Sequence, residues 1–310
     1  MTGAGHPFGH TRPGAPTRAQ ASGQAGRQES APAKVNLILH VGPRLESGLH
    51  ELCSLFASID LADDVMIEPR ADAAGTAADA LGDVVDAPGV PGRNLADEAL
   101  AAFRAAAPAA PLPPLAVEIA KRIPVAAGLG GGSADAAAVL RAANRIAGEP
   151  LDDAALLSVA AAIGSDVPSQ LDPGHALVTA TGERVEPVEL PPFALVLVPQ
   201  EEGLSTAAVY AELDRLGGAR EFLDPAPLRA VAAASVEQLA SALENDLQRA
   251  ALSLRPELGG VLAALREAGA LGALVSGSGP TAFGIFAGRP EAEAATSGLP
   301  RAVVAQARAA

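Results

Sequence analysis

Hydrophobic and polar residues alternate along the first patterned stretch of the chain. In residues 34–41 every odd position is Val or Leu, and the even positions are Lys34, Asn36, Ile38 and His40. A period of two predicts a β-strand, because successive side chains of a strand point to opposite faces. This strand is therefore expected to have one apolar face and one face that carries polar side chains.

Short apolar runs and helical patterns follow one another along the rest of the chain. Residues 42–48 predict a turn, and residues 71–92, rich in Ala, Gly and Asp, predict a short strand within loops. The other predicted strands are residues 55–67, 115–119, 193–198, 272–275 and 282–286, with a hairpin over 175–188. The predicted helices are residues 94–107, 133–147, 152–163, 205–216, 226–232, 235–251 and 256–268. Interleaved strands and helices without an internal repeat indicate an α+β or α/β enzyme in two lobes.

Two changes in composition predict the limits of the domains. Residues 1–30 contain Gly, Pro, Gln, Arg, Ser and Thr without apolar periodicity, which predicts a disordered leader outside the fold. At Pro191 and Pro192 the chain changes character again. We therefore expect an N-terminal lobe over residues 31–190 and a C-terminal lobe over residues 191–310.

Composition excludes several classes of function. A chain of 310 residues with 49% hydrophobic residues can build one large or two medium domains. It has no apolar run long enough to cross a bilayer and nothing like the core of a signal peptide, so we expect a cytoplasmic protein without a membrane partner. The single Cys53 excludes an internal disulfide and cysteine-based zinc sites. A formal charge of −14 argues against nucleic acid as a partner, because such a surface must be basic.

A glycine-rich segment carries the strongest functional signal. In P-V-A-A-G-L-G-G-G-S, Gly128, Gly130, Gly131 and Gly132 precede Ser133, the predicted N-cap of an alanine-rich helix. Glycines also form ordinary turns, but four of them at a helix start favour a phosphate site made of backbone N–H groups. The segment is not a Walker A motif, since no Lys precedes Ser133, and it does not fit the Rossmann glycine pattern.

Two charged residues become informative beside this loop. Asp166 lies between Gly164 and Pro168, and Lys34 lies on the polar face of the first strand. Alone, the Asp would be a turn residue and the Lys an edge residue with an extended side chain. Transfer of a phosphoryl group to an alcohol needs a proton acceptor, a cation and Mg²⁺. The combination therefore predicts a phosphotransferase.

Three ordered motifs resemble those of the GHMP small-molecule kinases. They are A-P-A-K-V-N-L from residue 31, the glycine-rich segment, and S-G-S-G-P from residue 276. The family resemblance implies a ribosomal-protein-S5-like N-terminal α/β lobe and a ferredoxin-like C-terminal lobe, with the active site between them. H-E-L from residue 50, K-R-I-P from residue 121 and G-S-D-V-P from residue 164 are most similar to the subfamily that uses 4-diphosphocytidyl-2-C-methyl-D-erythritol. The implied reaction transfers the γ-phosphoryl group of ATP to the 2-hydroxyl of that compound, in the non-mevalonate route to isoprenoid precursors.

The resemblance also implies roles for individual residues. Lys34 and Asp166 match the catalytic pair, with Asp166 as the base for the substrate hydroxyl. The residues that match the ATP site are Pro124, Gly128, Leu129, Gly130, Gly131, Gly132 and Ser133, with Asn94 and Lys121 near the adenosine. The residues that match the substrate site are Asn36, Leu49, His50, Tyr210, Gly277 and Gly279. Ser133 is the candidate ligand of Mg²⁺, the expected partner is a small molecule, and the expected state is a monomer or homodimer.

The chain departs from the subfamily pattern at three positions. Leu49 stands where a Tyr usually stacks on the cytosine, so Tyr210 is expected to carry more of that contact. Ser169 replaces a packing aromatic residue, and Ala134 replaces a frequent Ser. Two alternatives stay open: a GHMP kinase for mevalonate, phosphomevalonate or homoserine, and a catalytically silent nucleotide-binding relative.

Overall fold

The computed structural model describes residues 27–70, 82–90, 92 and 94–309. Most of the predicted leader, residues 1–26, therefore lies outside the described residues. The remaining part of that prediction is wrong, because residues 27–30 form the start of the first strand.

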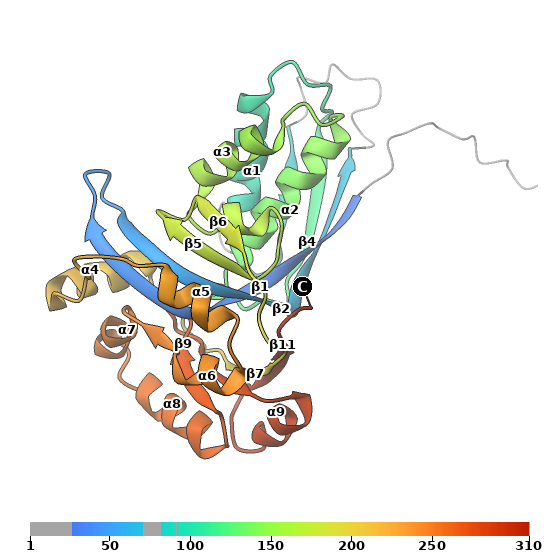
Figure 1. Cartoon of the computed structure of the whole chain (residues 1–310). Helices are drawn as coiled ribbons and strands as arrows, with labels where there is room; N and C mark the ends of the chain where they lie inside the picture. Colours follow the sequence, from blue (N-terminus) through green and yellow to red (C-terminus); the bar gives the residue numbers. More distant parts are fainter. Residues whose placement is uncertain (1–26, 71–81, 91, 93, 310) are drawn as a thin grey trace, which may run out of the picture.

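Two long antiparallel strands, β1 (Arg27–Arg44) and β2 (His50–Pro69), run through the centre of the molecule (Figure 1). In the described part of the chain they belong to a seven-stranded sheet of order β3-β4-β2-β1-β8, from which β5 and β6 extend beside β2. The other strands of this sheet are β3 (Val84–Asp86), β4 (Leu115–Ala120), β5 (Ala176–Ala180), β6 (Arg184–Pro187) and β8 (Glu244–Asn245).

The pattern of β1 is more irregular than its sequence predicts. A β-bulge between Asn36 and Ile38 interrupts the alternation of faces. Residues 31–39 are all buried, including Lys34 and Asn36, so the polar face is covered by protein and does not face open solvent.

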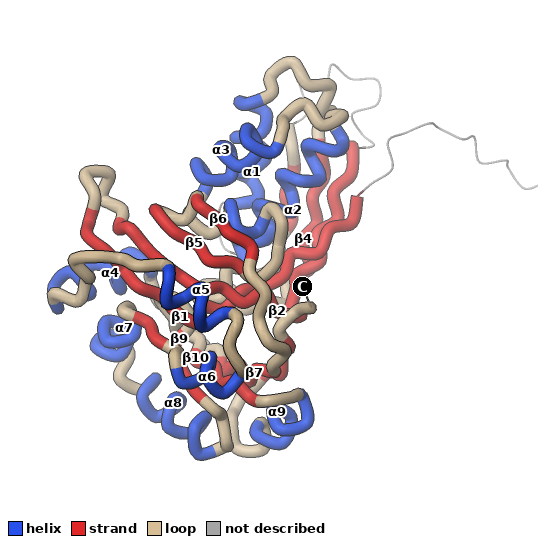
Figure 2. Tube along the Cα trace, in the orientation of Figure 1, coloured by secondary structure: helices blue, strands red, loops and turns tan. Residues whose placement is uncertain are grey.

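Three helices lie on one side of the large sheet and share one hydrophobic core with it (Figure 2). They are α1 (Leu95–Ala106), α2 (Gly131–Ile146) and α3 (Asp153–Ile163), and the short 3₁₀ turn η3 (Pro168–Gln170) follows α3. The buried side of α2 consists largely of alanine, which lets the helix approach β1 and β2 closely. The start of α2 is thereby brought beside the middle of β1.

A second, smaller sheet lies against the other side. Its antiparallel order is β11-β7-β10-β9 in the described residues. Its strands are β7 (Ala194–Val198), β9 (Gly272–Val275), β10 (Ala282–Phe286) and β11 (Val303–Gln306). The helices of this half are α4 (Thr206–Leu216), α5 (Ala226–Ala232), α6 (Val236–Ser241), α7 (Gln248–Leu254), α8 (Leu258–Glu267) and α9 (Arg289–Ala295). Leu37 of the large sheet shares one hydrophobic core with Phe193 and Phe283, so the two halves are packed together.

The predicted single helix over residues 235–251 is wrong. The chain forms α6, turns into β8, which pairs in parallel with β1, and then forms α7. The side chain of Asn245 donates to the carbonyls of Val275 and Gly277 (both 2.8 Å), and a continuous helix could not place it there. Strand β11 and helix α9 were not predicted from the sequence.

The domain boundary at residue 190 stays a prediction. The smaller sheet begins at β7, but β8 returns to the large sheet. Within the residues that the structure describes, no helix has the length and apolar character needed to span a bilayer.

Candidate active site

The glycine-rich segment forms a tight loop between β4 and α2. Gly128 and Gly130 adopt positive φ values of 76° and 70°, in the left-handed region that favours glycine. A Cβ at Gly130 would lie 2.9 Å from Cγ of Lys34, so the loop contacts the lysine stem directly. The backbone N–H of Lys34 also donates to the carbonyl of Leu129 (3.0 Å), which ties the loop to β1.

The prediction that Ser133 caps helix α2 is wrong. The N-cap is Gly130, whose left-handed turn starts the helix at Gly131 and leaves Ser133 in its first turn. The first intrahelical hydrogen bond runs from Ala134 N–H to the Gly130 carbonyl (2.9 Å). The N–H groups of Gly131, Gly132 and Ser133 precede that bond and have no acceptor within the helix. They face an anion better than a capped helix would.

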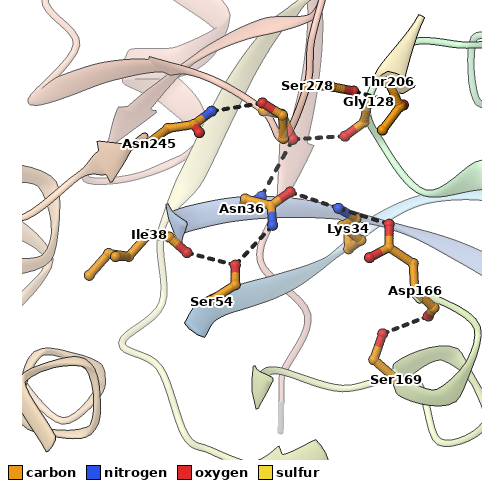
Figure 3. A network of polar contacts seen from close by, with 12 residues as sticks. Lys34, Asn36, Ile38, Ser54, Gly128, Asp166, Ser169, Thr206, Asn245 and Ser278 are labelled. Carbon is orange, nitrogen blue, oxygen red and sulfur yellow. Dashed lines mark hydrogen bonds and ion pairs between the residues drawn. The ribbon is translucent and has the colours of Figure 1, made fainter. Parts of the chain in front are cut away.

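Lys34 and Asp166 form an ion pair with a distance of 3.1 Å between Nζ and Oδ2. The lysine side chain is 6% exposed and the aspartate 32%, so the carboxylate is the more open of the two groups. Figure 3 shows Lys34 between Asp166 and Asn36, whose Oδ1 accepts from Nζ at 2.6 Å. The ring of Phe56 lies below the ammonium group, 4.6 Å from Nζ to its centroid.

Ser169 supports the turn that carries the carboxylate. Its hydroxyl donates to the backbone carbonyl of Asp166 (2.8 Å), and the side chain is buried in η3. The Ser that replaces an aromatic residue therefore closes the Asp166 turn through a hydrogen bond.

One cavity of about 850 Å³ connects these groups. All of the predicted site residues line it except Gly279. Gly279 lies behind the wall, where its carbonyl would be 2.8 Å from a Cβ on Gly128. The two glycine-rich loops are therefore in packing contact at this point, and the place of Gly279 near a ligand stays a prediction.

The loop over residues 276–280 reaches the first loop from the smaller half of the molecule. The Ser276 hydroxyl donates to the carbonyl of Gly128 (2.9 Å), and Asn245 holds the carbonyl of Gly277. Ser278 shares a hydrogen bond with Thr206 at the start of α4 (3.0 Å; Figure 3). Both halves of the chain therefore contribute to the cavity wall.

At one end of the cavity His50, Leu49 and Tyr210 lie together. The rings of His50 and Tyr210 are tilted by 35° with centroids 5.2 Å apart, and Leu49 is half exposed. His50 Nε2 is 2.8 Å from Oδ1 of Asp214, a residue that the sequence did not single out. Its position one turn after Tyr210 on α4 is the only signal that could have indicated it. Burial, and secondly the charge of Asp166, raises the pKa of Tyr210 to about 12.

Asn94 and Lys121 also line the cavity, and Lys121 lies beside the start of α2, where its Nζ would be 3.4 Å from a Cβ on Gly131. The Asn94 side chain caps α1, accepting from two backbone N–H groups. Lys121 Nζ lies between Asp63 (2.5 Å) and Asp135 (2.7 Å). Burial opposes the charge of Lys121, but these carboxylates outweigh it and raise the pKa of the ammonium. For Asp135 burial prevails and raises the pKa of the carboxyl to about 6.

Comparisons with known proteins agree with this architecture. The GHMP kinases N terminal domain matches residues 94–174, and the GHMP kinases C terminal domain matches residues 228–305. The 4-diphosphocytidyl-2-C-methyl-D-erythritol kinase of Nocardioides sp. is 45% identical over 81% of this chain and 85% of its own. The protein of that name from Streptomyces coelicolor is 44% identical over 81% of this chain and 84% of its own.

Solved structures extend the comparison. A crystal structure of 4-(cytidine 5'-diphospho)-2C-methyl-D-erythritol kinase has a TM-score of 0.72 and 35% identity, covering 90% of this chain and 98% of that one. The mevalonate kinase of L. major, at 17% identity, a TM-score of 0.67 and coverage of 94% and 99%, shares the fold. The two family domains, the relatives and the two-lobed α+β architecture give one conclusion: the chain belongs to the GHMP kinase family.

Proposed function

We propose that the protein transfers the γ-phosphoryl group of ATP to the 2-hydroxyl of 4-diphosphocytidyl-2-C-methyl-D-erythritol. The relatives that are named 4-diphosphocytidyl-2-C-methyl-D-erythritol kinase match 81% of the chain. The observation that carries the proposal is the ion pair of Lys34 and Asp166, at 3.1 Å, in the same cavity as the uncapped start of α2. A base and an anion site that share one cavity suit phosphoryl transfer.

Asp166 is the group that handles the proton. The acceptor oxygen forms a bond to the γ-phosphorus, the bond from that phosphorus to the β–γ bridging oxygen breaks, and ADP leaves. Asp166 takes the hydroxyl proton, for which its partly exposed carboxylate is available. Lys34 holds the carboxylate of Asp166 in place through the ion pair and offsets negative charge on the moving phosphoryl group.

The first turn of α2 is the proposed triphosphate site. Gly131, Gly132 and Ser133 line the cavity and lack helical acceptors for their N–H groups. The Ser133 hydroxyl also fits Mg²⁺, which accepts one or two protein oxygens and completes its shell with phosphates and water. Bound there, Mg²⁺ would offset the charge of the β- and γ-phosphates. No three His, Cys, Asp or Glu side chains cluster as metal ligands in the described parts of the chain, which suits a cation that arrives with the nucleotide.

The end of the cavity near His50 is the proposed cytidine site. Leu49 and Tyr210 provide apolar and aromatic surface for a base, and His50 provides a polar edge held by Asp214. Asp166 is close enough to Tyr210 for its charge to raise the pKa of the tyrosine, and its ion-pair partner Lys34 packs against Gly130 of the glycine loop. These neighbours fit a substrate whose alcohol lies between its nucleotide and the donor phosphate.

An assay with several acceptor alcohols, each offered separately, tests the identity of the substrate. The protein is supplied with ATP and Mg²⁺ and with the cytidine diphosphate acceptor, mevalonate or homoserine, and ADP release is measured. We expect turnover with the cytidine compound alone. Turnover of mevalonate or homoserine in its place would refute the proposed acceptor.

Substitution of the proposed base tests the mechanism. Asp166→Asn should lower kcat by about 10²- to 10⁴-fold, the usual contribution of a general base, with little change in KM for ATP. Asp172→Asn is the matched control, because Asp172 is exposed and lies outside the cavity lining. Full activity of Asp166→Asn would refute the assigned role.

A further inference from the structure

Ser54 is a buried hydroxyl beside the catalytic pair that the chemistry above does not use. It lies on β2, is 0% exposed, and makes two hydrogen bonds (Figure 3). Its Oγ donates to the carbonyl of Ile38 at 2.7 Å and accepts from Nδ2 of Asn36 at 2.9 Å. A hydroxyl has one proton, and a carbonyl can only accept. The serine proton is therefore committed to Ile38, and the serine oxygen can serve Asn36 only as an acceptor.

This commitment fixes the orientation of the Asn36 amide. The amide must turn its NH₂ group towards Ser54, which turns Oδ1 towards Nζ of Lys34 at 2.6 Å. In the reversed orientation an NH₂ donor would face the lysine ammonium, which is itself only a donor. The resemblance assigns Asn36 to the substrate, but in this structure its amide is occupied by Ser54 and Lys34.

The orientation of Asn36 in turn determines how Lys34 is held. The ammonium has three protons, of which one is directed to Asn36 and one to Asp166. The third is free to face the cavity that Lys34 lines. Gly130 packs on the lysine stem and Phe56 lies under its ammonium, so the side chain has little freedom.

We propose that Ser54 is a positioning residue for phosphoryl transfer. It orients the Asn36 amide, and this amide in turn holds the ammonium group of Lys34 beside Asp166. This inference rests on the proposed function, in which Lys34 and Asp166 act on the acceptor hydroxyl. Without the serine oxygen the Asn36 NH₂ group loses its acceptor, and only Lys34 is left to select the orientation of the amide. The amide is then held less firmly, and the lysine has a less stable acceptor. Lys34 would then hold Asp166 less well while the nucleotide site, built on α2, stays intact.

The chain offers a matched control on the same strand. Ser58 is 1% exposed, lies opposite Lys34 in the pairing of β1 with β2, and its Oγ has no hydrogen-bond partner among the described residues. Ser58→Ala therefore removes an equally buried hydroxyl that orients nothing. Ser54→Thr keeps a hydroxyl and serves as the rescue variant.

The first measurement is steady-state kinetics of Ser54→Ala, Ser54→Thr and Ser58→Ala, with kcat and KM for ATP determined separately. We expect kcat of Ser54→Ala to fall about tenfold, as for the loss of a hydrogen bond that supports a charged group, with KM for ATP unchanged. Ser58→Ala should match the wild type, and Ser54→Thr should recover most of the loss. Equal kcat for Ser54→Ala and Ser58→Ala would overturn the proposal.

A second measurement separates this inference from the substrate assignment. The ¹⁵N signal of the Lys34 ammonium reports how fast its protons exchange with water, and it needs no substrate. Exchange should be faster in Ser54→Ala than in the wild type and in Ser58→Ala, with thermal unfolding confirming that each variant folds. If the wild type phosphorylates none of the offered alcohols, the proposed function fails. Unchanged exchange in Ser54→Ala would still refute the positioning role independently.

Discussion

The contact between the two glycine-rich loops can be tested at Gly128. A Cβ at this position would lie 2.5 Å from the carbonyl oxygen of Ser276 and 2.8 Å from that of Gly279. Both are backbone atoms, so the overlap cannot be relieved by rotation of a side chain. Gly148 is the matched control, since its φ of 83° is similar to the 76° of Gly128 and a Cβ there meets nothing within 4 Å. Gly128→Ala and Gly148→Ala therefore share the conformational cost and differ in the clash.

The difference in free energy of unfolding between Gly128→Ala and Gly148→Ala follows from the hydrogen bonds that must lengthen in Gly128→Ala. A left-handed conformation costs an alanine about 1–2 kcal/mol, which is the whole effect expected for Gly148→Ala. At Gly128 the second loop must also retreat, which lengthens the bonds from Ser276 Oγ to the Gly128 carbonyl (2.9 Å) and from Thr281 N–H to the Ala127 carbonyl (3.2 Å). At about 1 kcal/mol for each bond, Gly128→Ala should cost about 2 kcal/mol more than the control.

Urea unfolding of both variants at one temperature measures this difference, and steady-state kinetics measures its effect on the site. We expect KM for ATP to rise in Gly128→Ala and to stay normal in Gly148→Ala. Gly148 follows the C-terminal end of α2 and does not line the cavity. Equal free energies of unfolding for the two variants would refute the packing of one loop on the other.

Burial raises the pKa of the Cys53 thiol from 9.0 to about 11, against the opposing charge of Arg229. Because the unfolded thiol ionises first, the free energy of unfolding should fall by up to about 3 kcal/mol between about pH 9 and pH 11. Cys53→Ala should lack this fall in urea unfolding, and an identical slope in both proteins would contradict the assignment. At the cytidine end, Asp214→Ala should raise KM for the acceptor about tenfold and leave KM for ATP unchanged, because His50 loses the partner that holds its Nε2. A normal acceptor KM would show that His50 needs no such support.

The local pattern of apolar and polar residues was enough to predict helices that do not depend on contacts with distant strands. Helix α5 has the predicted bounds, and α4 differs from its prediction by one residue. The failed helix over residues 235–251 shows the limit, because Leu239, Leu243 and Leu247 keep a helical spacing through the break. Leu239 and Leu247 belong to different hydrophobic cores, and the chain between them pairs with β1. Tertiary contacts therefore outweigh a regular apolar pattern there.

In the candidate site, too, local motifs identify some residues, and others are brought in only by contacts between distant segments. Residue types and order were sufficient to identify Lys34, Asp166 and the glycine loop as one group. The partner of His50, by contrast, is Asp214, which is 164 residues away in the sequence. Ser54 follows the H-E-L motif in the sequence, but its contact with Asn36 depends on the pairing of β1 with β2. Groups that orient catalytic residues come from contacts of high sequence separation, which a local pattern does not encode.

Because the molecule is strongly negative, the backbone of the glycine loop matters more for binding an anion than the cationic side chains of the cavity do. Within the described residues, the cationic side chains that line the cavity are Lys34, Lys121 and Arg44, and the lining holds as many aspartates. Both lysines are paired with carboxylates, and the whole chain carries −14. Long-range attraction would therefore not hold the proposed triphosphate, and the proposal gives this part to the dipoles of the first turn of α2 at short range. A Cβ at Gly131 would lie 2.9 Å from Ile123 and 3.4 Å from Nζ of Lys121, which would push this turn away from its support. Gly131 is thus required by packing below the loop, in addition to the close approach of the proposed phosphate above it.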